Sequence, residues 1–226
     1  MPEVSCIIPS YNEGPRIKTI LQAVYRHPLI NEIIVIDDGS KDQTKDVVKG
    51  FEGVKLIIHE KNKGKSQAVI DGIVRSRGDT IFLLDADLIG LTFKDVSGLI
   101  EPVILHKADI TISLRKNSPW IFRKIGLDFI SGERVFPKML VQNHLDKIKK
   151  LPSFGLEVYL NKLIIKNKYR IKIIFWKNVI SPWPYEKRGI LRGIKSFSFM
   201  IIDILRTVSA YEVARQITRM SFLKVK

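Results

Sequence analysis

The first half of the chain alternates short apolar runs with segments of helical periodicity, and this alternation restricts the fold more than any other feature of the sequence. Near-continuous apolar runs are typical of strands buried on both faces, and helices of about 10–15 residues between them supply the crossovers of a parallel sheet. We expect strands over residues 4–8, 33–36, 54–58, 81–84 and 108–114. We expect helices over residues 17–24, 42–51, 65–76 and 93–103. The pattern predicts an α/β fold with a Rossmann-like, mostly parallel central sheet and helices on both faces.

The second half is less regular. We expect helices near 119–128, 137–147 and 155–167, a strand over 171–176, a proline-rich turn over 181–184 and helical sequence from Lys187 to the end. This organisation divides the chain into a ligand-binding half over 1–115, a second half of the same domain over 116–186, and a C-terminal helical extension over 187–226.

Charge is distributed unevenly between the two halves. The net charge is +15, but residues 1–113 hold 14 basic and 16 acidic side chains, whereas residues 114–226 hold 24 basic and 7 acidic ones. An excess of this size predicts an anionic partner for the second half, and nucleic acid, an anionic membrane and a phosphorylated substrate all fit it. No zinc-finger, RNP or helix-turn-helix signature accompanies the charge, so we do not expect nucleic acid.

Targeting signals are absent from the pattern. Strand-like sequence begins at Val4 without a preceding signal peptide, and no stretch reaches the 18 or so apolar residues of a membrane span. The single cysteine, Cys6, cannot form an internal disulfide, which favours a reducing compartment. We therefore expect a cytoplasmic protein, either soluble or peripheral at the inner face of the membrane.

Polar residues end each of the first four strands, where ligands bind in open parallel sheets. The four segments are Pro9-Ser10-Tyr11-Asn12-Glu13, Asp37-Asp38-Gly39-Ser40, Asn62-Lys63-Gly64-Lys65 and Asp85-Ala86-Asp87. Asp85 and Asp87 can share a hard divalent cation such as Mg²⁺ or Mn²⁺ with substrate phosphates. An isolated pair of this kind is usually a solvated turn, but here three other polar segments accompany it.

Lys65 lies in a segment that imitates a phosphate-binding loop. Gly64-Lys65-Ser66 matches the end of the P-loop pattern, but His59 stands where that pattern requires glycine. At the start of a helix, Lys65 still suits a phosphate or ribose contact. One carboxylate of the Asp37-Asp38 pair can accept a hydrogen bond from a base or ribose, and Ser40 can cap the following helix.

Together the four segments resemble glycosyltransferase family 2, whose members have the GT-A fold. The resemblance covers residues 3–115 and continues more weakly to about 190. It implies a nucleotide-sugar transferase, in which Pro9, Tyr11 and Glu13 hold the nucleoside and Asp38 reads the base. It also implies that Lys65 contacts the nucleotide, that Asp85 faces ribose or metal, and that Asp87 binds the metal beneath the diphosphate.

The same resemblance assigns acceptor-side roles to the second half. The segment Ser131-Gly132-Glu133-Arg134 resembles the place where family members approach the transferred sugar, so Gly132, Glu133 and Arg134 become site residues. Glu157 is the candidate general base, although relatives often have Glu-Asp where this chain has Leu156-Glu157-Val158; a role limited to the helix dipole is the alternative.

Two further segments follow from the resemblance to the family. Some relatives carry a histidine metal ligand near the position of Ser181. The four histidines of this chain (His27, His59, His106 and His144) lie elsewhere, and we expect each at the surface or a helix end.

Lys187, Arg188 and Arg192 follow the proline-rich turn, where basic side chains can close over the diphosphate; a solvated face is the alternative.

The C-terminal extension combines apolar periodicity with basic charge. Residues 187–226 contain nine basic and two acidic side chains, which is typical of an interfacial membrane helix. A helix packed on the protein's own core, or against a partner subunit in a homodimer, explains the pattern equally well.

These observations predict a metal-dependent transferase that moves a hexose from a UDP- or GDP-sugar to a phosphorylated or lipid-linked acceptor such as a polyprenyl phosphate. A soluble transferase with a small anionic acceptor such as a phosphoglycerate is the near alternative. A non-catalytic nucleotide-binding domain is the alternative from another class.

Overall fold

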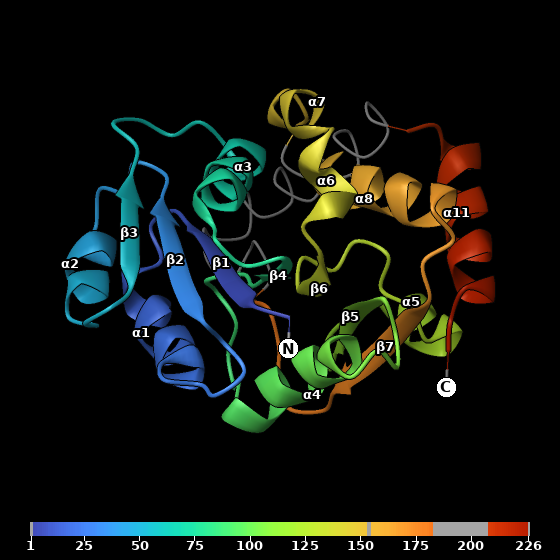
Figure 1. Ribbon diagram of the computed structural model, residues 1–226, viewed down its shortest axis with the longest axis horizontal. Coiled ribbons are helices and arrows are strands. Elements are labelled where there is room, and N and C mark those ends of the chain that lie inside the picture. Colours follow the sequence, from blue (N-terminus) through green and yellow to red (C-terminus); the bar gives the residue numbers. More distant parts are fainter. Residues whose placement is uncertain (1, 153–154, 183–207, 226) are drawn as a thin grey trace.

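The computed structural model describes residues 2–152, 155–182 and 208–225 (Figure 1). Its strands are β1 (Val4–Ser10), β2 (Glu32–Asp37), β3 (Lys55–Ile58), β4 (Thr80–Leu83), β5 (Ile110–Arg115), β6 (Arg134–Pro137) and β7 (Ile171–Trp176). Its helices are α1 (Gly14–Val24), α2 (Thr44–Lys49), α3 (Lys65–Arg75), α4 (Phe93–Ile104), α5 (Trp120–Ile125), α6 (Met139–Gln142), α7 (Leu145–Lys149), α8 (Gly155–Lys166) and α11 (Ala210–Phe222).

One sheet runs through both halves of the described chain, in the order β3-β2-β1-β4-β6-β5-β7. Strands β1 to β4 are mutually parallel, and β5 is parallel to β7. The expected α/β fold with a mostly parallel central sheet is therefore confirmed, including a helix at the C-terminal end.

Strand β6 was not expected from the sequence. It lies antiparallel between β4 and β5, and it joins the first four strands to the last two. Its sequence, Arg134-Val-Phe-Pro137, follows Glu133 directly, so an alternation-based prediction treats the segment as polar loop. Arg134, its first residue, is fully buried and is accommodated there because its guanidinium donates to Asn161 Oδ1 and to backbone carbonyls.

Helices cover both faces of the sheet, as Figure 1 shows. Helices α1, α2 and α4 pack on one face, where they share an apolar cluster with the side chains of β1 and β2 that point to the same face. Helices α3, α6, α7, α8 and α11 pack on the other face. The single helix expected over 137–147 is two short helices, because Asn143 and His144 leave the helical conformation between them.

Helix α11 packs against α8 on the protein's own core. Met220 is fully buried, and the Gln216 side-chain amide donates to the Val158 carbonyl over 3.1 Å. After the helix, the backbone of residues 223–225 hydrogen-bonds to Ile171 at the start of β7. The outer face of α11 carries Tyr211, which is 78% exposed.

The C-terminal extension expected over 187–226 lies only partly within the described residues. Its helical character is confirmed for residues 210–222, and the portion over 187–207 lies outside them. Among residues 2–152, 155–182 and 208–225, no helix is long and apolar enough to cross a bilayer.

Candidate active site

The carboxyl ends of β1, β2 and β4 lie side by side, so the polar segments that follow them meet at one edge of the sheet. Ser10 at the end of β1 is paired in register with Asp37 at the end of β2, and Ile7 is paired with Leu83 at the end of β4. Asp37 is also paired with Ile58 at the end of β3. The four sequence-predicted segments that follow β1 to β4 therefore lie around the same edge, as the topology of an open parallel sheet requires.

The first two segments are tied together through backbone hydrogen bonds. The Asn12 amide donates to Ser40 Oγ over 2.9 Å, and the Lys41 amide donates to Asn12 Oδ1 over 2.8 Å. Asn12 has a φ of 56°, a conformation that asparagine tolerates better than most residues. These bonds fix the loop that carries Tyr11, which is 37% exposed, and Glu13, which pairs with Arg16 over 2.6 Å.

Asp38 holds the loop that precedes α3. Its carboxylate accepts from the backbone amides of Lys63 and Gly64, each over 2.8 Å, and its Oδ1 lies 2.7 Å from Nδ1 of His59. Asp38 is buried, so the sequence-predicted base-reading acid is also a structural anchor.

The position of two histidines corrects the sequence-based expectation. His59 and His27 are buried at 6% and 2% exposure, whereas both were expected at the surface or at a helix end. His27 packs against Phe93 with a ring-centroid distance of 4.0 Å, and its Nε2 lies 3.1 Å from Ser97 Oγ. Both histidines are held in the interior because their ring nitrogens find polar partners there.

Lys65 links the two halves of the site. It is the first residue of α3, and its Nζ lies 2.8 Å from Asp85 Oδ1 and 2.9 Å from Glu157 Oε1. Burial alone would lower the pKa of Lys65, but the charges of Asp85 and Glu157 outweigh this effect and raise the pKa above its usual value. The ammonium therefore stays charged between an acid of the first half and an acid of the second.

Glu157 occupies the first turn of α8 and is 2% exposed. Its Oε1 accepts from Lys65, whereas its buried Oε2 makes no hydrogen bond with any of the residues that the structure describes. A buried carboxylate oxygen of this kind can accept a proton or a hydrogen bond from a bound molecule.

Gly132 allows the two halves to approach closely. A Cβ at this position would lie 2.5 Å from Asp85 Oδ2 and 2.8 Å from Lys65 Nζ, both far inside van der Waals contact. The glycine expected on the acceptor side is thus in contact with the donor-side acid and lysine.

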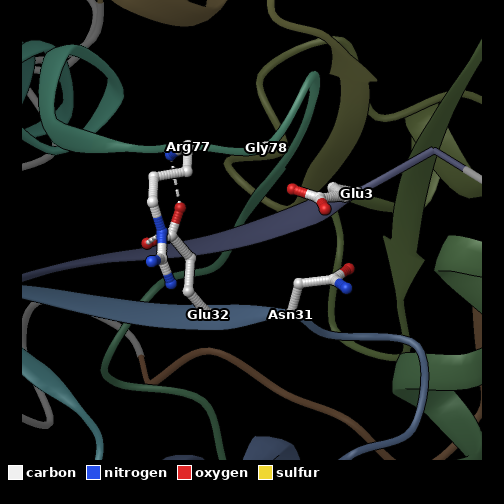
Figure 2. Close-up of a pocket in the computed structure, with 5 residues that line it drawn as sticks. All are labelled: Glu3, Asn31, Glu32, Arg77 and Gly78. Carbon is white, nitrogen blue, oxygen red and sulfur yellow. Dashed lines mark hydrogen bonds and ion pairs between the residues drawn. The ribbon is translucent and has the colours of Figure 1, made fainter.

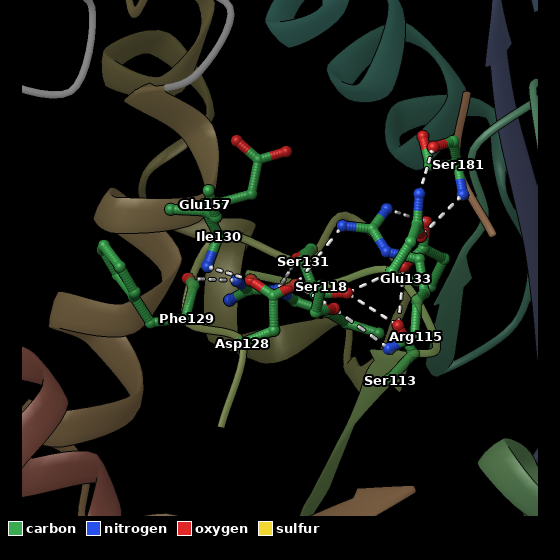
Figure 3. A network of polar contacts seen from close by, with 12 residues as sticks. Ser113, Arg115, Ser118, Asp128, Phe129, Ile130, Ser131, Glu133, Glu157 and Ser181 are labelled. Atoms are coloured by element: carbon green, nitrogen blue, oxygen red, sulfur yellow. Dashed lines mark hydrogen bonds and ion pairs between the residues drawn. The ribbon is translucent and has the colours of Figure 1, made fainter. Parts of the chain in front are cut away.

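Beside Gly132, a buried polar network forms the wall of the site (Figure 3). Glu133 is fully buried; its Oε2 accepts from the hydroxyls of Ser113 and Ser131, over 2.6 and 2.7 Å, and its Oε1 accepts from Arg115 over 3.0 Å. Burial raises the pKa of Glu133, and the nearby charge of Asp85 adds to the increase, although Arg115 and the two serines oppose it.

Arg115, at the end of β5, is a site residue that the sequence patterns did not single out. Its guanidinium pairs with Glu133 and, at 3.4 Å, with Asp128. Burial alone would lower the pKa of Arg115, but these two acids raise it, and Asp85 and Asp87 add to the effect. The sequence feature that could have identified Arg115 is its position as a basic residue directly after an apolar run.

Arg134 lies behind the wall. It is fully buried, and its guanidinium donates to the carbonyls of Ser131 and Phe129 and to Asn161 Oδ1 over 2.6–2.8 Å. Its side chain therefore supports the wall from the interior, and direct contact of Glu133 or Arg134 with an acceptor stays a prediction.

The acid pair after β4 suits a metal that is shared with a substrate. Asp85 and Asp87 are both half-buried and are separated by the buried Ala86. Across the described residues, no group of three or more histidine, cysteine or carboxylate side chains could hold an ion. The residues therefore fit Mg²⁺ or Mn²⁺ bound through one or two carboxylates plus phosphate oxygens, rather than a metal held by protein ligands alone.

The segment before the proline-rich turn is fastened next to the acid pair. Ile89 and Ile180 form an antiparallel bridge, and the Asn117 side chain donates to the Ser181 carbonyl over 2.7 Å. Ser181 therefore reaches the neighbourhood of the loop that carries Asp87. Lys187, Arg188 and Arg192 lie outside the described residues.

A second polar hollow lies at the opposite, amino-terminal edge of the sheet (Figure 2). It is lined by Glu3, Asn31, Glu32, Arg77 and Gly78. The Glu32 carboxylate accepts from Ser5 Oγ over 2.7 Å, from Lys55 Nζ over 2.6 Å and from the Arg77 amide. None of the sequence-predicted site residues lines this hollow.

Comparison with known proteins gives the geometry a family context. The chain is 39% identical over 113 residues to human dolichyl-phosphate beta-glucosyltransferase, an alignment that covers 43% of this chain and 34% of that protein. It is 31% identical to UDP-N-acetylglucosamine–dolichyl-phosphate N-acetylglucosaminyltransferase of Methanococcus voltae, over 84% of this chain and 92% of the relative. The chain spans about a third to a half of the length of the dolichyl-phosphate beta-glucosyltransferases that it matches.

The fold resembles that of glucosyl-3-phosphoglycerate synthase from Mycobacterium tuberculosis, which was solved with Mn²⁺, UDP-glucose and phosphoglyceric acid. The TM-score is 0.69 at 20% identity, over 91% of this chain and 79% of that one. The family model described as "Glycosyl transferase family 2" matches residues 5–167. With the sheet, the acid pair and the polar strand ends in place, the chain belongs to glycosyl transferase family 2.

Proposed function

We propose that this protein transfers a hexose from a UDP- or GDP-sugar to a phosphorylated or lipid-linked acceptor of the polyprenyl-phosphate type, with Mg²⁺ or Mn²⁺. The observation that carries the proposal is the bridge from Asp85 through Lys65 to Glu157. It connects the acids that suit a metal and a nucleotide to the buried acid that suits the acceptor, so both substrates would meet at one point.

The donor would lie across the carboxyl ends of β1, β2 and β4. Pro9, Tyr11 and Glu13 would hold the nucleoside, and Asp38 would orient the base from the loop that it anchors. Asp85 would face the ribose, and Lys65 would contribute a fixed positive charge near the diphosphate.

A divalent ion held by Asp87 and Asp85 would neutralise the charge that develops on the nucleoside diphosphate as it leaves. Arg115 lies within the field of both acids and, anchored by Glu133 and Asp128, it could stabilise negative charge on either substrate without reorienting. Lys187, Arg188 and Arg192 are proposed to close over the same diphosphate.

The acceptor would bind against the wall of Gly132 and Glu133, which Arg134 supports from the interior, with Glu157 in reach. An anionic acceptor matches the excess of 17 positive charges in residues 114–226. The relatives named for dolichyl phosphate support a lipid-linked acceptor, and the phosphoglyceric acid in the solved neighbour supports the small anionic alternative. Peripheral contact of residues 187–226 with the inner face of the membrane, and a homodimer, belong to the same proposal.

A donor screen tests the proposal and requires no acceptor. UDP- and GDP-hexoses are incubated with the protein and Mn²⁺, and hydrolysis is measured beside calorimetric binding of UDP and GDP. We expect metal-dependent binding and slow hydrolysis of one donor, both lost in Asp87→Asn. Binding without hydrolysis or transfer would favour the non-catalytic nucleotide-binding domain, and no binding of any nucleotide would overturn the proposal.

The chemistry of Glu157 separates the two kinds of acceptor. A phosphate oxygen is already ionised when it attacks the sugar, whereas a hydroxyl must lose a proton, and general-base catalysis contributes about 10²–10⁴-fold. With undecaprenyl phosphate as acceptor, we expect Glu157→Gln to lower kcat by about tenfold or less, well below that range. With 3-phosphoglycerate, a loss of at least about 100-fold is expected. Comparable transfer to both acceptors by the unmodified protein would contradict the assignment of one acceptor class.

A further inference from the structure

His59 lies between two carboxylates in the interior, behind the site. Its Nδ1 is 2.7 Å from Asp38 Oδ1, and its Nε2 is 2.9 Å from Asp71 Oδ2 on α3. The His59 side chain is only 4% exposed. Both ring nitrogens of His59 thus have a carboxylate partner, and the two contacts together fix the orientation of the ring.

Each of the two acids also accepts a hydrogen bond from another part of the protein. Asp38 accepts from the Lys63 and Gly64 amides, and Asp71 Oδ1 accepts from the Gln67 side-chain amide over 3.0 Å. Both carboxylates thus act as acceptors toward these other donors. His59 therefore connects a carboxylate that holds the loop before α3 to a carboxylate of α3 itself.

The loop held by this arrangement leads directly to Lys65. Asp38 binds the last two amides before the helix, so its orientation determines where α3 begins and where the Lys65 side chain starts. Asp71 lies six residues further along the same helix, so His59 also ties the body of α3 to the strand-end loop.

We propose that His59, with Asp71 behind it, is a positioning residue for the nucleotide-binding loop, because it fixes Asp38 against residues 63–64 and thereby sets Lys65 between Asp85 and Glu157. The expected effect on donor binding rests on the proposed function, because the proposal predicts weaker donor binding when the contact between His59 and Asp38 is lost. The claim that His59 fixes the loop concerns the ligand-free protein and does not depend on any substrate.

Two substitutions separate the contacts of His59. In His59→Asn the amide nitrogen can replace ring Nδ1 and keep the bond to Asp38, whereas in His59→Gln it can replace Nε2 and keep only the bond to Asp71. We expect the Lys63 and Gly64 amides to exchange with solvent about tenfold faster in His59→Gln than in the unmodified protein, and within about threefold of it in His59→Asn. Hydrogen exchange followed by NMR measures both amides.

Kinetics with UDP-glucose as probe gives the functional result, with a GDP-hexose in its place if the donor screen selects one. We expect His59→Gln to raise the KM for the donor about tenfold with kcat changed by less than about threefold, and His59→Asn to leave both near their original values. The matched control pair is His27→Asn and His27→Gln, a second buried histidine on the other face of the sheet, which should lower Tm without changing either readout.

The outcomes distinguish the alternatives. Equal effects of the two His59 variants on exchange would mean that His59 only fills space, and faster exchange in His59→Asn alone would assign its role to Asp71; either result overturns the proposal. If the unmodified protein binds no nucleotide, the proposed function fails, but the exchange comparison still decides whether His59 positions the loop.

Discussion

Two buried glutamates at opposite edges of the sheet have the same kinds of partner and opposite electrostatic outcomes. Glu32 lies at the amino-terminal edge, where burial alone would raise its pKa, but hydrogen bonds from Lys55, the Arg77 amide and Ser5 lower the pKa to about 2. The basic partners remain in water, since the Lys55 and Arg77 side chains are 44% and 73% exposed.

Glu133, at the site edge, also has a basic partner and serine hydroxyls, yet its pKa is raised. Burial is complete there, and the charge of Asp85 nearby opposes ionisation. Charges at the amino-terminal edge therefore stabilise the fold, whereas the site edge holds charges that oppose one another. Concentrated and partly unfavourable charge is what a site for anionic substrates and metal requires.

The largest expected difference between the two edges is in the stability lost when the basic partner of each glutamate, Arg115 or Lys55, is replaced. Arg115→Met leaves Glu133 and Asp128 without their basic partner in the interior, and we expect the free energy of unfolding to fall by about 3–5 kcal/mol. Lys55→Met removes a half-exposed partner and should cost less than about 1 kcal/mol. Urea unfolding at pH 7 measures both, and equal losses would refute the contrast.

Glu32 and Glu133 should contribute to the pH dependence of stability with opposite signs. Because the folded pKa of Glu32 is about 2, below the ordinary value of 4.5, its contribution is present above pH 4.5 and is lost as the pH falls toward 2. We expect this contribution to be about 2 kcal/mol, after allowance for the exposed partners. The raised pKa of Glu133 acts in the opposite sense, so its ionisation lowers stability as the pH rises above the ordinary glutamate range.

Unfolding free energies of the unmodified protein, Glu32→Gln and Glu133→Gln between pH 3 and pH 8 test these signs. Glu32→Gln should flatten the acid side of the profile, and Glu133→Gln should remove a loss above about pH 4.5. Parallel profiles for all three proteins would show that neither carboxylate is linked to folding as described.

The smallest expected effects come from replacing one glycine at each edge by alanine. A Cβ on Gly78 would lie 2.4 Å from the backbone oxygen of Glu3, whereas a Cβ on Gly132 would meet the side-chain ends of Asp85 and Lys65. We expect Gly78→Ala to cost about 1 kcal/mol of stability with donor hydrolysis unchanged. Gly132→Ala should cost less stability, because flexible side chains can move, but should reduce hydrolysis; the reverse pattern would contradict the assignment of the edges.

The fold was largely predictable because apolar strands and helical periodicity dominate the first half. The position of Asp38, Lys65 and Asp85 at one edge was predictable because a parallel sheet gathers its strand ends there, whereas their roles stay predictions. Strand β6 was missed because its flanking charges, Glu133 and Arg134, obtain their partners only after folding. A pattern of polar and apolar residues cannot distinguish a charge in water from one that is paired in the interior.

The same limit applies to individual side chains. Arg115 and His59 carry no motif, and their contacts are with acids 12–21 residues away in sequence. The pairing of Lys65 with Glu157, 92 residues apart, is a property of the assembled sheet. Sequence spacing could place each of these two residues on an element, but not against the other.

Helix α11 and residues 223–225 have a consequence for synthesis on the ribosome. Helix α8 ends at Lys166 and α11 ends at Phe222, so 56 further residues must be made before Met220 can cover its part of the core. At about 5–20 residues per second, this takes about 3–11 s. During that interval the apolar surface of α8 and the start of edge strand β7 lack the contacts that α11 and residues 223–225 later supply, so this part of the core stays open to aggregation until the last residues are made.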